Sequence, residues 1–166
     1  MSHAPLTSQS TGRIDDLLTL ALKRLGEVLA MEASGREPEW AESLADALGR
    51  VEAAFRQHRS GAKAPGGMLG EVDQTRPTLV RQAEGVRSGH NDLLRLVVDL
   101  RQEVRRATKA SARGPDLAAK PDQEPLANVA ALRDQAKQLY SRIRQNMETE
   151  ANLLRESINT DIGVGD

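Results

Sequence analysis

Apolar residues recur every three to four positions along four long stretches of this 166-residue chain. This spacing puts them on one face of an α-helix, whereas no segment alternates polar and apolar residues long enough to predict a strand. The four apolar stripes are Ile14, Leu18, Ala21, Leu25, Val28 and Leu29; Trp40, Leu44, Ala47, Leu48, Val51 and Phe55; Leu79, Ala83, Val86, Leu93, Val97, Leu100 and Val104; and Val129, Leu132, Ala136, Leu139, Ile143 and Leu153. We therefore predict an all-α fold, an up-down-up-down antiparallel four-helix bundle.

The stripes and the Gly- and Pro-rich segments between them set the expected boundaries. Helices are expected over about 13–33, from Pro38 to a loop at 59–67, over about 68–110, and over about 126–158. Pro38 suits a first helical position, while Pro77 either kinks the third helix or starts a new one. The expected organisation is a flexible N-terminal arm (1–12), the bundle (13–160) and a C-terminal tail (161–166).

The composition excludes several classes of function. With 23 basic and 24 acidic residues and only three aromatic ones, the chain offers neither a basic surface nor stacking groups for nucleic acid. It has no cysteine for thiolate chemistry, no apolar run of membrane-spanning length and no secretory signal. We find no phosphate-binding glycine loop or nucleophile elbow. These features predict a cytoplasmic protein that is not an enzyme and has neither nucleic acid nor a membrane as a partner.

Four polar residues interrupt the apolar stripes. His58 follows Phe55 by three positions, His90 follows Val86 by four, and Asn146 and Glu150 lie between Ile143 and Leu153. At roughly 1.5 Å per residue, the connection between the last two helices places His90 and Asn146 at a similar height, where they could meet across the core. The position of His58 is left open by the 59–67 loop. Imidazole and carboxylate groups on facing helices indicate a metal site, or alternatively a structural patch of hydrogen bonds.

Three segments resemble the bacterial hemerythrin-like (HHE cation-binding) family, four-helix bundles that in their full form hold a di-iron centre for oxygen or related small molecules. They are "FRQHRSGA", "RPTLVRQAEGVRSGHNDLL" and "RQNMETEANLLRESINTDIGVGD". The resemblance implies that His58 and His90 occupy ligand positions and that Glu150 occupies an acidic position of the last helix. Asn146 stands where the family places a histidine and Ala62 where it places a glutamate, and the first helix contains no histidine.

These departures imply a site that has lost most of its ligands. The expected metal residues are His58, His90 and Glu150, with Asn146 at a lost ligand position. They would bind iron weakly, as one or two ions, or not at all. The leading hypothesis is a non-enzymatic, hemerythrin-like binding or sensing domain that is poor in iron. One alternative is a functional non-haem iron site that senses O2, NO or redox state, with a small diatomic ligand. The other is a metal-free protein-interaction scaffold, acting as a homodimer or with an unknown protein partner.

Overall fold

The computed structural model describes residues 7–63, 67, 69–70, 78–112 and 128–159. Within these residues the chain forms four helices and no strand: α1 (Thr7–Ala30), α2 (Glu37–Lys63), α4 (Val80–Ala112) and α5 (Val129–Asn159). The expected all-α four-helix bundle is therefore confirmed. None of the described helices has an apolar stretch that could cross a membrane.

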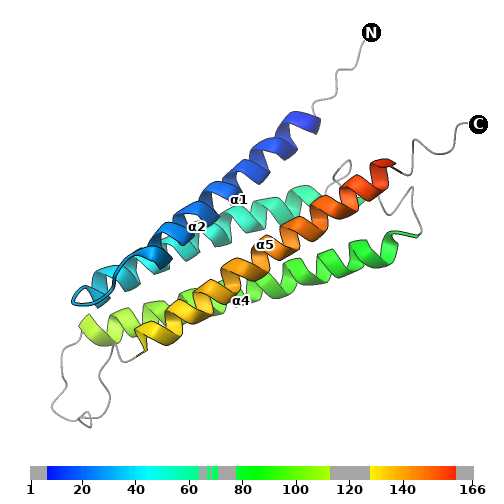
Figure 1. Cartoon of the computed structure of the whole chain (residues 1–166). Helices are drawn as coiled ribbons and strands as arrows, with labels where there is room; N and C mark the ends of the chain where they lie inside the picture. The colour runs from blue at the N-terminus through cyan, green and yellow to red at the C-terminus, as the bar shows by residue number, and fades with distance from the viewer. Residues whose placement is uncertain (1–6, 64–66, 68, 71–77, 113–127, 160–166) are drawn as a thin grey trace, which may run out of the picture.

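Neighbouring helices pack in antiparallel fashion (Figure 1). In that view the chain reverses direction between α1 and α2, and again between α4 and α5. Contacts between α2 and α4 run in opposite sequence order, since Arg101 donates to Glu52 at 2.7 Å while Arg59 donates to Asn91 at 2.9 Å. The start of α5 contacts the end of α1, where Arg133 donates to the carbonyl of Met31 at 2.8 Å.

The expected stripes form the interior. Every stripe residue of α2 and α4 is buried, and so are those of α1 and α5 whose side chains are described, except Val129, which is half-buried. Most of them belong to one core that all four helices share. A smaller cluster near the end of α2 consists of Ala62, Leu69, Leu79, Ala83, Val86 and Leu153. The 3–4 spacing therefore identified the buried faces correctly.

Several expected helix boundaries were wrong by about a turn or more. α1 begins at Thr7, inside the segment expected to be an arm, because each residue added to an existing helix gains a backbone hydrogen bond, which offsets the low helix propensity of Ser, Thr and Gly. α2 continues to Lys63, into the expected 59–67 loop, because burial of Ala62 against the smaller cluster stabilises another turn. α1 ends at Ala30, before Gly35, which has φ 74° in the connection. Pro77 and the tail lie outside the described residues.

Trp40 fixes the junction between α1 and α2. Its side chain is 1% exposed, its Nε1 donates to the carbonyl of Val28 at 3.0 Å, and the Arg133 guanidinium lies 4.9 Å from the ring centroid. We expect Trp40→Phe to lower the free energy of unfolding by about 1–2 kcal/mol in urea, since it removes a buried hydrogen bond and some volume. Tyr140→Phe is the control, because the Tyr140 hydroxyl makes no hydrogen bond within the described residues. Equal stability of the two variants would contradict a role for the indole N–H.

Candidate metal centre

Three helices each contribute one polar residue to a single buried point. His58 lies near the end of α2, His90 in the first half of α4 and Glu150 in the second half of α5. Their exposed fractions are 7%, 0% and 8%. His58 Nε2 lies 2.8 Å and His90 Nε2 3.2 Å from the same carboxylate oxygen, Glu150 Oε2. The structure thus brings together the three residues that the sequence marked as metal ligands.

Glu150 is ionised in this environment. Burial alone raises its pKa, but the hydrogen bonds and positive charge of His58 and His90 outweigh burial and lower the pKa to about 2. A carboxylate only accepts hydrogen bonds, so without an ion both imidazoles donate their Nε2–H to it. An ion bound here would take the place of these two protons between the rings and the carboxylate.

Phe55 holds the two imidazoles in place. Its side chain is fully buried, and it lies one turn before His58 on α2. The Phe55 ring stacks on that of His58 with centroids 6.0 Å apart, and the edge contact with His90 has centroids 5.5 Å apart. The two imidazole rings meet at 75° with centroids 5.3 Å apart. In the sequence, Phe55 showed only the periodicity of a core residue, so its role beside the site was not predicted.

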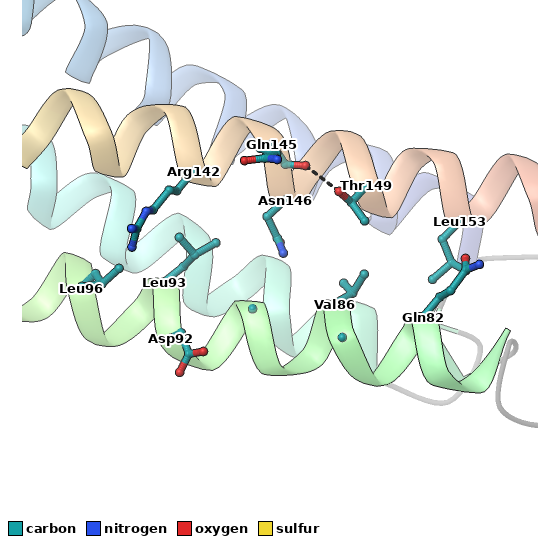
Figure 2. A pocket seen from close by; sticks show the side chains of 12 residues that line it. Gln82, Val86, Asp92, Leu93, Leu96, Arg142, Gln145, Asn146, Thr149 and Leu153 are labelled. Carbon is teal, nitrogen blue, oxygen red and sulfur yellow. Dashed lines mark hydrogen bonds between the residues drawn. The ribbon is translucent and has the colours of Figure 1, made fainter.

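The similar height of Asn146 and His90 predicted that these two side chains would meet across the core, but they do not pair. Asn146 reaches from α5 toward α4 (Figure 2) and lies against Gly89, where a Cβ would be 2.6 Å from Asn146 Nδ2. Its Oδ1 is buried without a hydrogen-bond partner. The height estimate was correct to about one helical turn, and Glu150, one turn further along the same face of α5, contacts His90 instead. Ala62, where the resemblance expects a carboxylate, packs in the smaller apolar cluster.

The donor set and its spacing fit one metal ion. Two imidazole nitrogens and a carboxylate oxygen lie within 4.8 Å of one another. Ligand atoms on one ion, at about 2.0–2.2 Å from it, are on the order of 3 Å apart, so small side-chain movements would suffice. Among the described residues, no fourth His, Cys, Asp or Glu joins the group. Three ligands are too few to hold two ions. His90 Nδ1 is buried without the hydrogen-bond partner that commonly orients a metal-bound imidazole, which weakens the site.

Comparisons with protein families, with curated proteins and with solved structures gave no match for this chain. The resemblance to hemerythrin-like proteins therefore rests on the three short segments alone.

Proposed function

We propose that this bundle is a metal-binding domain that holds one divalent transition-metal ion between His58, His90 and Glu150. The observation that supports it most directly is the convergence of three buried donor groups from three helices on one point. Two imidazoles and one carboxylate are the donor set of mononuclear Zn²⁺ and Fe²⁺ sites in other proteins, where further coordination positions stay open to small ligands. A single ion with open positions suits a binding or sensing role.

Three ligands are compatible with only some of the hypotheses drawn from the sequence. A full di-iron centre needs more ligands than these three residues supply, so the hemerythrin-like resemblance supports a reduced, mononuclear site. An iron ion in it could bind O2 or NO, which keeps the sensing alternative within the same proposal. The cytoplasmic location and the lack of an enzymatic role remain predictions from the sequence.

Metal titration tests the proposal. The protein is stripped with a chelator and titrated with Co²⁺, whose visible absorption reports nitrogen and oxygen ligation, and with Zn²⁺ by calorimetry. We expect one ion per chain. Glu150→Gln should weaken binding by more than about 100-fold, since even an outer partner of a ligand is typically worth 10- to 100-fold.

Glu148→Gln is the matched control, because Glu148 is an exposed carboxylate two residues from Glu150 on the same helix. It should bind Co²⁺ as the parent does. Equal loss in both variants would show nonspecific binding to surface acids and would contradict the proposal. Iron content after aerobic purification, with oxo-bridge absorption and about two irons per chain, would instead favour the di-iron alternative.

The second candidate is a metal-free scaffold. The observation in its favour is that Glu150 Oε2 already accepts a hydrogen bond from each imidazole. These two hydrogen bonds stabilise the buried carboxylate without an ion. On this hypothesis Co²⁺ and Zn²⁺ would not bind stoichiometrically, and neither ion would raise the thermal midpoint of unfolding. A metal site would raise it by an amount that grows with the logarithm of the ion concentration above the dissociation constant, because an ion that binds only the folded chain stabilises it.

A further inference from the structure

A groove of about 510 Å³ lies between α4 and α5, and its lining includes residues that neighbour His90 and Glu150 along these two helices. We call it the α4–α5 groove. Figure 2 shows the two helices forming its sides, with Asn146 projecting between them. Neither His90 nor Glu150 lines the groove, but the residues around each of them do. The groove therefore lies beside the two ligands along both helices.

On the α4 side, two glycines are among the residues that line the groove. Val86 and Leu93 line it four residues before and three residues after His90. Gly85, directly before Val86, and Gly89, between Val86 and Leu93, also line the groove. A Cβ at Gly85 would point into open space, whereas a Cβ at Gly89 would collide with the Asn146 amide. The glycines therefore allow Asn146 to lie against the α4 backbone beside His90, and they leave space for a small molecule.

On the α5 side, the groove offers hydrogen bonding and positive charge. Asn146 lies four residues before Glu150, and its buried Oδ1 has no partner, so it can accept a hydrogen bond from a bound molecule. Leu153, three residues after Glu150, continues the apolar surface. Arg142 makes no ion pair within the described part of the chain, and it lies at one end of the groove in Figure 2. In the same view Asp92 points away from α5.

Charge balance at the ion defines the ligand. Two neutral imidazoles and the Glu150 carboxylate leave one positive charge of a divalent ion uncompensated. In a buried site this favours a monoanion at an open coordination position. The Arg142 guanidinium would attract the same charge to the groove. The apolar walls formed by Val86, Leu93 and Leu153 favour a hydrocarbon chain on that anion, and Asn146 Oδ1 favours a donor group beside its charge.

We propose that the α4–α5 groove is the ligand subsite of this metal centre, and that it takes a short carboxylate with an apolar chain and a hydroxyl group next to the carboxylate. The carboxylate binds the ion, the hydroxyl donates to Asn146 Oδ1, and the chain lies between α4 and α5. This inference rests on the proposed metal function. For the carboxylate to reach the ion, the Asn146 side chain would move away from Gly89, where it is the only side chain within 4 Å of that glycine's missing Cβ among the described residues.

The test uses the full chain loaded with Co²⁺ and follows the visible absorption during titration. The probe is 2-hydroxy-4-methylpentanoate, compared with 4-methylpentanoate, which lacks the hydroxyl, with glycolate, which lacks the chain, and with the uncharged 4-methylpentanol. We expect the probe to change the Co²⁺ spectrum at saturation. Loss of the hydroxyl or of the chain should each weaken binding by roughly 5- to 10-fold, and the alcohol should leave the spectrum unchanged.

Two variants assign these effects to the groove. Asn146→Leu should keep Co²⁺ binding and remove the preference for the hydroxyl. Gly85→Leu has room for its side chain in the groove, so it should keep Co²⁺ binding and remove the preference for the chain. Gln138→Leu, at an exposed amide of α5 outside the groove, is the control and should change neither.

The outcomes separate the two proposals. Absence of Co²⁺ binding in the parent protein would overturn the metal function and this inference with it. Normal Co²⁺ binding without a spectral response to any carboxylate would overturn only the ligand subsite. The same result follows if Asn146→Leu and Gly85→Leu bind all probes as the parent does, because the anions would then reach the ion by another route.

Discussion

Lowering the pH from 6 to 2 should destabilise the metal-free protein by roughly 3 kcal/mol through Glu150 alone. The pKa of this carboxyl is about 2 in the folded chain, because the hydrogen bonds from His58 and His90 outweigh the effect of burial, against an ordinary value of 4.5. Above pH 4.5 the group is ionised in the folded and unfolded states, and its full contribution to stability is present. Between pH 4.5 and 2 the unfolded chain takes up a proton that the folded chain does not, so the contribution is lost as the pH falls.

Urea unfolding of the chelator-treated protein at a series of pH values measures this loss. Glu150→Gln carries no titrating group at the position, so its unfolding free energy should fall less steeply in acid. The pKa values of Glu37 and Glu52 are also lowered, but both groups titrate in both proteins. Their contributions to the pH dependence therefore cancel in the difference between the two unfolding free energies. The parent should be clearly more stable than Glu150→Gln at pH 6, and the gap should nearly close at pH 2. Parallel pH profiles would show that Glu150 is not held ionised by the two histidines.

The residues of the site could be predicted from the sequence because helical periodicity decides which side chains face inward. His90 and Glu150 replace apolar residues on stripes that are otherwise regular, so their burial followed from the same pattern as that of Val86 and Leu153. In a helix, turning a polar side chain out of the core would require turning its apolar neighbours out too. The convergence of a histidine and a carboxylate between two helices was therefore foreseeable to within one turn.

The exact partners could not be predicted. The height of two residues can be estimated from the number of residues to the connection, but only to about one turn. Asn146 and Glu150 lie four residues apart on nearly the same face of α5, so a shift of one turn, about 6 Å, exchanges one for the other opposite His90. The place of His58 depended on where α2 ends, and burial of Ala62, which extends that helix, is a tertiary effect. The contact between Gly89 and Asn146 could not be predicted, because it depends on the absence of a side chain at Gly89, which has no periodic pattern in the sequence.

Phe55→Ala should have the largest effect on stability, a loss of about 3–5 kcal/mol in the free energy of unfolding, because it leaves a cavity at a fully buried position. It should also weaken Co²⁺ binding by about 10-fold or more, since the Phe55 ring packs against both imidazoles and restricts their orientation. Denaturation of the metal-free variant gives the first quantity, and Co²⁺ titration well below its unfolding midpoint gives the second. Phe55→Leu should recover most of the stability and part of the affinity.

Leu44→Ala separates the two effects. Leu44 is also fully buried on α2, but it lies about 20 Å along the helix from His58, at roughly 1.5 Å per residue. Its truncation should cost a comparable 2–5 kcal/mol and leave Co²⁺ affinity unchanged, because no ligand ring rests on it. If Leu44→Ala and Phe55→Ala reduce Co²⁺ affinity equally, the metal site responds only to the stability of the bundle. If Phe55→Ala alone reduces it, the aromatic ring that packs against both histidines determines how well three side chains from three helices hold one ion.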